Sequence, residues 1–198
     1  MWSSRRTKYI LAFVAVVLVG YGIVRLTQAG GGVPQNFTTA RTQGAIIAQN
    51  IVNLSNQSTA TLAQIDTLDQ KQDYADALTL TTSLVAQSQE IRDQAVQLSG
   101  QIQQMTQSLS GVSDVNEQQA ALESISNRLA LISQLINYSG DLGKLLDALR
   151  SRFSGTGGTN AQVTALVDQV NTDVNAINSF NSQAGQAMDR FDGIVNKQ

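Results

Sequence analysis

The stretch YADALTLTTSLVAQSQEIRDQAVQLSGQIQQMTQSL, residues 74–109, repeats apolar or small side chains along its whole length. The spacing alternates between four and three residues, which is the heptad pattern of helices that pack as coiled coils. The side chains predicted to face inward are Ala77, Thr81, Leu84, Ser88, Ile91, Ala95, Leu98, Ile102, Met105 and Leu109. A helix of about 54 Å with a single apolar stripe needs partner helices along its full length, so this stretch predicts a helical bundle.

Three further segments repeat the pattern, at residues 36–68, 114–153 and 160–197. Turn residues separate them: Asp73 is a good helix cap, Gly111 suits a helix end, and residues 154–158 read as a loop. In the third segment the predicted inward side chains are Val115, Leu122, Ile125, Leu129, Ile132, Ile136, Leu146, Leu149 and Phe153. Short connections force antiparallel neighbours, so we expect an all-α, elongated, up-down-up-down four-helix bundle with coiled-coil-like packing over residues 36–198.

The N-terminal part has a different composition. Residues 9–24, YILAFVAVVLVGYGIV, form an uncharged apolar run from Tyr9 to Val24, about 24 Å long as a helix. Basic residues precede it, so the positive-inside rule predicts a cytoplasmic segment 1–8 and a transmembrane signal-anchor helix over 9–28. A Gly-rich hinge, 29–35, then leads to a bundle outside the cytoplasm, periplasmic or at the cell surface. The alternative is a cleaved signal sequence, with cleavage near Ala29 and a secreted bundle.

The composition excludes several classes of function. The chain has no Cys and no His, so zinc sites, Ser-His-Asp triads and Cys-His pairs are impossible within it. After Arg25, nine Lys and Arg face 15 Asp and Glu, a balance of −6 that argues against nucleic acid as a partner. No cofactor, metal or catalytic site is expected. An enzyme using two carboxylates ranks lowest, because a narrow bundle offers no cleft for them.

One candidate site is acidic and lies at the turn between the first two helices, far from the membrane. Four carboxylates surround this turn: Asp66, Asp69, Asp73 and Asp76. Such a group can bind a hard cation such as calcium, but the spacing lacks the glycine and the final Glu of an EF-hand loop. Helix capping and solvation explain the same residues without a metal, and we treat the group as a candidate partner-contact tip.

A second candidate lies near the membrane, where helical heights place several glycines at one level. Missing side chains there leave room for a small apolar ligand, whereas large neighbours can equally fill the space. The residues of this candidate ligand cavity are Gly44, Gly100, Met105, Gly185, Met188 and Phe191. Phe37 is expected at the same end, and Tyr74 is expected to meet Phe153 at the opposite end.

One membrane helix followed by an exported antiparallel bundle is a layout that resembles LemA-type proteins and the four-helix ligand-binding domains of bacterial chemoreceptors. The resemblance concerns layout alone and assigns no role to any residue. We therefore expect a non-enzymatic, membrane-anchored protein that acts by protein–protein contact, as a scaffold, spacer or accessory subunit of a cell-envelope assembly. Its partner is an unidentified protein or a second copy of itself. The alternative is a small-ligand binding or sensing module that uses the membrane-proximal cavity.

Overall fold

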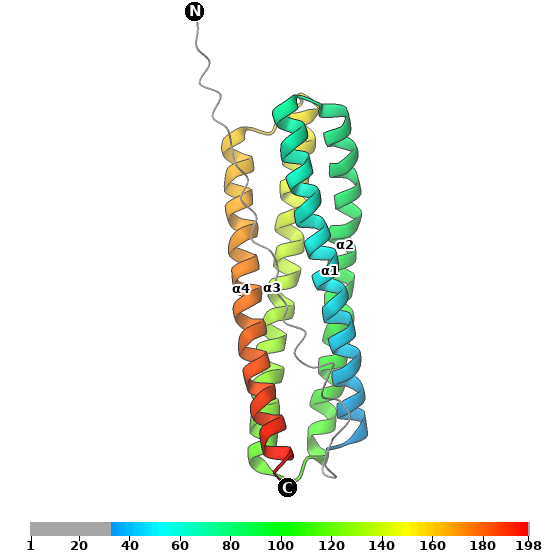
Figure 1. Ribbon diagram of the computed structural model, residues 1–198, viewed down its shortest axis with the longest axis vertical. Coiled ribbons are helices and arrows are strands. Elements are labelled where there is room, and N and C mark those ends of the chain that lie inside the picture. The colour runs from blue at the N-terminus through cyan, green and yellow to red at the C-terminus, as the bar shows by residue number, and fades with distance from the viewer. Residues whose placement is uncertain (1–32, 198) are drawn as a thin grey trace, which may run out of the picture.

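A computed structural model describes residues 33–197 of the chain. It contains four long helices, α1 (Gln35–Lys71), α2 (Tyr74–Ser108), α3 (Val115–Phe153) and α4 (Asn160–Val195). A short 3₁₀ helix, η1 (Leu109–Gly111), follows α2. The four helices run alternately up and down one long axis (Figure 1), so the predicted all-α four-helix architecture is confirmed.

The predicted membrane helix lies outside the described residues, together with segment 1–8 and most of the Gly-rich hinge. Between residues 33 and 197, none of the helices combines the length and the apolar character needed to span a bilayer.

Polar side chains define where three of the helices begin. The side chain of Asp73 accepts a hydrogen bond from the backbone N–H of Asp76 at 3.4 Å, as expected for the cap of α2. Asp114 caps α3 in the same way, and Thr159 caps α4. Such caps satisfy backbone donors that have no partner inside the helix.

The first helix ends later than the sequence pattern predicted. We expected residues 69–73 to interrupt it after Leu68, but α1 continues to Lys71. Gln72 then takes a left-handed conformation with φ of 63°, and its N–H donates to the carbonyl of Asp69 at 3.0 Å. The turn is therefore shorter than expected, because one left-handed residue suffices to end the helix.

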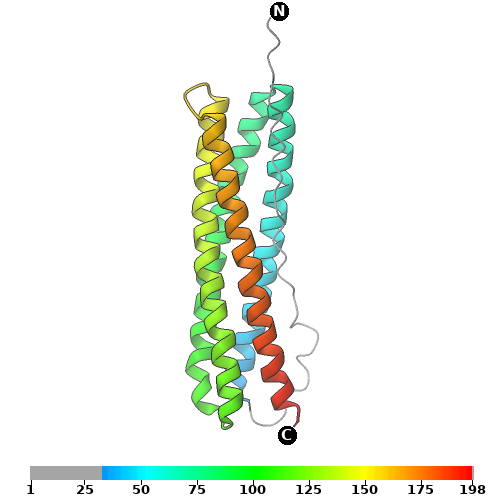
Figure 2. The same cartoon turned by 90° about the vertical axis from the view of Figure 1, so that its left-hand side faces the viewer.

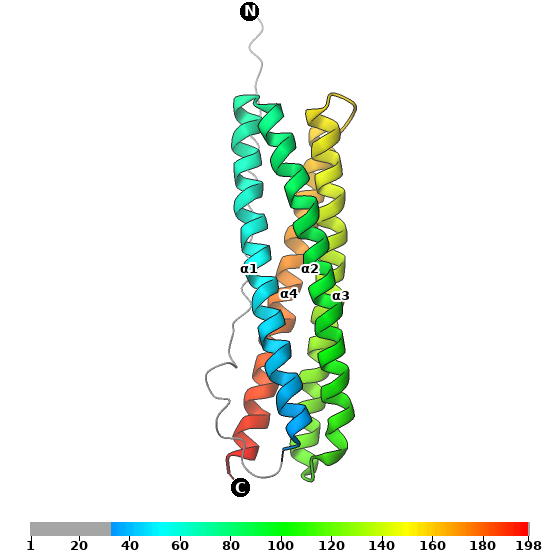
Figure 3. The same cartoon turned by 90° about the vertical axis from the view of Figure 1, so that its right-hand side faces the viewer.

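The core follows the predicted heptads closely in α2 and at the start of η1, where all ten predicted inward side chains are buried. Close packing joins α1 to α2, α2 to α3 and α3 to α4, whereas α1 and α4 approach each other less closely. Figures 2 and 3 show the resulting rod from its two sides. The outer members α1 and α4 thus each have one close neighbour, and α2 and α3 each have two.

Aromatic pairs mark the two ends of the rod, as the sequence predicted. At the end where α1 begins, the rings of Phe37 and Phe191 lie 5.3 Å apart. At the other end, Tyr74 and Phe153 stack with their centroids 5.8 Å apart. These contacts confirm the relative heights of the helices that were inferred from helix length and antiparallel order.

The prediction for α3 was partly wrong. Three side chains expected to face inward are exposed: Val115 by 73%, Leu122 by 50% and Leu129 by 48%. The core side of α3 is instead formed by positions such as Leu131, Leu135 and Leu142. Helix α3 carries two apolar stripes, and only one of them can point into the bundle.

Candidate functional site

The four carboxylates of the predicted acidic tip do not converge. Asp73 caps α2, and Asp76 lies exposed in its first turn. Asp66 accepts a hydrogen bond from Gln70 at 2.8 Å on the same helix. Nowhere in residues 33–197 do three or more potential metal ligands of the Asp, Glu, His or Cys type come together.

Asp69 is the member of the tip that makes a long-range contact. Its Oδ2 accepts a hydrogen bond from the guanidinium of Arg152 on α3 at 2.6 Å, while its buried Oδ1 has no hydrogen-bond partner. Desolvation raises the pKa of Asp69, and the charge of Arg152 opposes that rise. The contact joins α1 to α3 across the bundle, a structural role that sequence spacing did not indicate.

A small pocket adjoins Asp69 and is lined also by Asp66, Arg152, Asn160 and Thr164. Its volume is about 10 Å³, which is room for roughly one water molecule. A wider depression of about 330 Å³ lies on the surface near the α3–α4 loop, beside Lys144, Gly158 and Gln162. Neither pocket contains a residue of the predicted ligand cavity.

The structure places the six residues of that predicted cavity in two different environments. Met105, Met188 and Phe191 are buried in the core, and Gly44 is buried against Leu98. Gly100 and Gly185 are half-buried, and a Cβ built on either would meet no atom within 4 Å. Large side chains fill the core at this level, which includes the Phe37–Phe191 contact.

A carboxylate pair lies at the α3–α4 interface and was not predicted from the sequence. Asp173 on α4 is only 5% exposed. Burial raises its pKa to about 6, and the neighbouring charge of Asp141 on α3 adds to the rise. Lys144 donates to Asp141 at 2.7 Å, whereas Asp173 Oδ2 has no hydrogen-bond partner. Neither of these two pockets is lined by either carboxylate.

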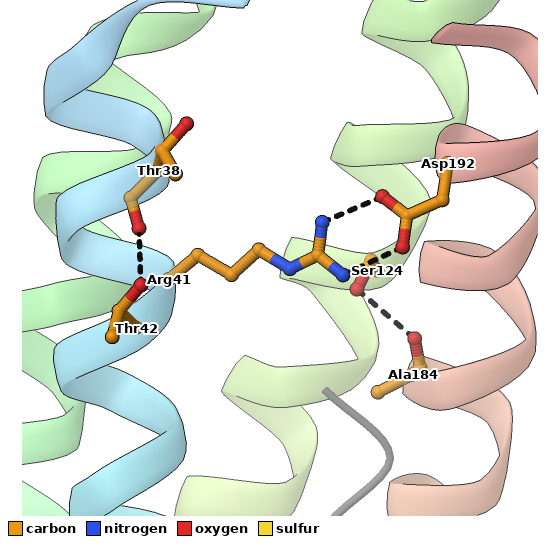
Figure 4. Close-up of polar contacts among 6 residues, drawn as sticks. All are labelled: Thr38, Arg41, Thr42, Ser124, Ala184 and Asp192. Carbon is orange, nitrogen blue, oxygen red and sulfur yellow. Dashed lines mark hydrogen bonds and ion pairs between the residues drawn. The ribbon is translucent and has the colours of Figure 1, made fainter. Parts of the chain in front are cut away.

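A bidentate ion pair links α1 to α4, which pack together less closely than consecutive helices do. Arg41 on α1 reaches across to Asp192 on α4, with N–O distances of 2.6 and 2.7 Å (Figure 4). Close to it, the hydroxyl of Ser124 on α3 donates to the carbonyl of Ala184 on α4 at 3.0 Å. Arg128 on α3 has a pKa lowered to about 10, first by burial and then by the charge of Arg41. Asp192 therefore offsets positive charge as well as joining α1 to α4.

The outer side of α3 carries the feature with the clearest potential for binding a partner. Val115, Leu122 and Leu129 are exposed at intervals of seven residues, and the half-buried Ile136 continues the line. Small exposed residues alternate with them. We define the α3 seam as the residues Val115, Leu122, Ser126, Leu129, Ser133, Ile136 and Gly140. From Leu122 onward its spacing alternates four and three, which is the pattern of a helix that packs against another helix.

The neighbouring part of α2 widens this surface. Ser88 and Ser139 exchange hydrogen bonds of 2.9 and 2.8 Å and so fix the relative heights of the two helices. Val96 follows Ser88 by eight residues and Leu129 precedes Ser139 by ten, so the two differ in height by only about 3 Å. Val96 is 57% exposed and, like Leu129, lies on the outer side of the α2–α3 contact.

The same surface is nearly free of charge. No charged residue occurs between Asp93 and Asp114, and Arg128 is the sole charged residue between Glu123 and Asp141. Glu123 pairs with Arg190 of α4 at 2.5 Å, and the Nε atom of Arg128 is buried. Scarcity of charged residues at the centre of a surface is typical of protein–protein interfaces.

The sequence contained a signal for this seam that we interpreted differently. Positions 122, 125, 129, 132 and 136 have heptad spacing and were taken together as one inward stripe. In the structure Ile125 and Ile132 are buried, while Leu122 and Leu129 face outward. A second series through Leu131, Leu135, Leu142 and Leu149 supplies the rest of the core side. The presence of two overlapping stripes was the available sign that one of them faces away from the core.

Comparisons of the chain with protein-family models, with curated proteins and with solved structures found no match, so the site is interpreted from its own geometry alone.

Proposed function

We propose that this protein is a non-enzymatic scaffold or accessory subunit of a cell-envelope assembly, and that it works by protein–protein contact through the α3 seam. The observation that carries the proposal is the outward line of Val115, Leu122 and Leu129. These side chains lie outside the buried core, and exposed apolar side chains aligned along one face of a helix are a candidate interaction site.

The proposed location rests on the sequence. The apolar run of residues 9–24, with its preceding basic residues, supports a single-pass anchor in the cytoplasmic membrane with the bundle outside. Mass spectrometry of the protein extracted from its host's membranes tests this location. A mass that includes residues 9–24 is expected, whereas a chain beginning near Ala29 contradicts the anchor.

Photo-crosslinking tests the contact surface. A benzoylphenylalanine at position 129 of the full-length protein, in its own host's membranes, is expected to give an adduct with another protein chain. The matched control carries the same group at Gln57, an exposed position of α1. Equal yields from the two positions, or no adduct from position 129, contradict the proposal.

A further inference from the structure

We propose that the partner of the α3 seam is a second copy of this chain, which lies parallel to the first so that the two α3 helices meet along a two-fold axis. This inference rests on the proposed function, because it identifies the partner for the same surface.

The spacing of the seam fits a helix as the occupant. Large side chains at Leu122, Leu129 and Ile136 alternate with small ones at Ser126, Ser133 and Gly140. In a two-stranded coiled coil, such positions form successive layers, and side chains of one helix insert between those of the other. Small residues in every second layer allow the helix axes to approach closely. A Cβ built on Gly140 would meet no atom of the described chain within 4 Å, so the fold itself leaves this space open.

The lack of charge fits a second copy in particular. In a parallel two-fold contact each residue meets its own counterpart, so every charge in the seam would face a like charge. Val115, Leu122, Ser126, Leu129, Ser133, Ile136 and Gly140 are all uncharged. Of the charged residues within this stretch of α3, Glu123 pairs with Arg190 of α4, and the Nε atom of Arg128 is buried. The surface therefore avoids the repulsion that a parallel homodimer would otherwise meet.

The size of the seam indicates how stable the dimer is. From Val115 to Gly140 it is roughly 38 Å long, and a helix contact about 10–12 Å wide then covers on the order of 400 Å² per chain. Val96 adds to its edge. A stable interface in solution needs about 800 Å² per partner, so this contact is weak by itself. Two chains anchored in one membrane have a high effective concentration, which compensates for a small interface.

The anchor also decides the direction of the pair. Chains held in one membrane by residues 9–24 present their bundles in the same direction, so their α3 helices are parallel. A parallel arrangement brings Ser126 next to Ser126 of the second copy. An antiparallel arrangement centred on residues 122–140, the part of the seam with regular spacing, would instead place Ser126 opposite position 136.

Cysteine crosslinking tests the dimer directly, because the chain contains no cysteine of its own. The full-length S126C variant is placed in phospholipid vesicles and oxidised with copper phenanthroline. The control is S182C, which changes an equally exposed serine on α4 away from the seam. We expect S126C to form a disulfide-linked species of twice the 21.2 kDa chain mass. Its yield is expected to exceed that of S182C by about tenfold or more.

A second variant tests whether the disulfide link between two S126C chains depends on the apolar side chains of the seam. L122Q/L129Q in the S126C background is expected to reduce crosslinking to the level of S182C. Both leucines are about half exposed, so the bundle is expected to remain folded, and a circular dichroism melt checks this. Crosslinking that survives these substitutions would overturn the proposal, because the contact would then not use the seam.

Other outcomes separate this inference from the proposed function. Equal yields from S126C and S182C overturn the homodimer. If the probe at position 129 then captures a different protein, the contact function stands and the second copy is wrong. If it captures nothing, both fail. A link between S126C chains and I136C chains, without an S126C self-link, overturns the parallel direction.

Discussion

Asp173 is an acidic side chain placed almost out of solvent, where its charged form is poorly solvated. Burial, together with the charge of Asp141, raises its pKa to about 6, and a hydrogen bond from Gln169 opposes the rise. In the unfolded chain the same group titrates near 3.8. The folded state therefore binds the proton more tightly, so Asp173 makes the fold progressively less stable as pH rises from about 4 to about 6.

We expect D173N to raise the free energy of unfolding at pH 7 by about 1–2 kcal/mol, because the neutral amide avoids the cost of burying a charge. At pH 4 the variant and the wild type are expected to differ little, since both then carry a neutral group. Urea denaturation between pH 4 and pH 8 measures the difference. The control is D168N, at an exposed position of α4. A D173N effect that stays constant with pH would contradict the assignment.

The ion pair between Arg41 and Asp192 predicts an asymmetric effect of substitution. Removing the carboxylate leaves Arg41 near Arg128 without compensation, whereas removing Arg41 leaves a carboxylate that is one-third exposed to water. We expect D192N to cost about 1–2 kcal/mol of stability and R41M less than about 1 kcal/mol. Denaturation of both single variants and of the double variant measures the coupling. Equal costs for the two single variants would show that Arg128 does not contribute.

Helix α3 has large apolar side chains both in the core and on the surface. Leu131 and Leu129 are the same residue type two positions apart, yet Leu131 is buried and Leu129 is 48% exposed. The first is part of the core, and the second belongs to the seam. Stability and the proposed association are therefore expected to depend on different side chains of one helix.

We expect L131A to reduce the free energy of unfolding by about 2–4 kcal/mol, because it leaves a cavity in the core. L129A in the same assay is expected to cost less than about 1 kcal/mol. Chemical denaturation of the two variants in dilute detergent, at low protein concentration to disfavour association, makes the comparison. A large cost for L129A would mean that this side chain supports the fold rather than a partner.

At the scale of the whole molecule, the four helices are not equivalent. Helices α2 and α3 pack closely against two neighbours each, whereas α1 and α4 pack closely against one. Helices with fewer close contacts open more readily by local unfolding. The Arg41–Asp192 pair and the Phe37–Phe191 contact join α1 to α4 at one end of the rod.

Hydrogen exchange monitored by mass spectrometry is expected to show slower exchange for the centres of α2 and α3 than for those of α1 and α4. Within α1 and α4, protection is expected to be greater near Arg41 and Asp192 than at mid-height. D192N serves as the matched variant and should reduce protection at that end alone. Uniform protection across the four helices would show that the α1–α4 contact is as strong as the others.

Much of this architecture was predictable from the sequence because it depends on local rules. Heptad spacing located four helices, and the capping side chain of Asp73 located the start of α2. Helix length and antiparallel order were enough to predict the contact between Tyr74 and Phe153. The acidic residues around the first turn were also recognisable, although their partners were not.

The remainder depended on how the helices rotate about their own axes, and periodicity alone does not determine this rotation. Two stripes on α3 have the same spacing, so only the packing against α2 and α4 decided that Leu129 faces outward and Leu131 inward. Two contacts could not be read from local spacing. The Asp141–Asp173 pair lies between α3 and α4, and the contact of Asp69 with Arg152 crosses the bundle from α1 to α3. The sequence by itself thus determined the number, length and order of the helices, because these follow from contacts between near neighbours in the chain. The tertiary structure alone decided which of the two stripes of α3 is buried, because that choice depends on how α3 packs against the other helices.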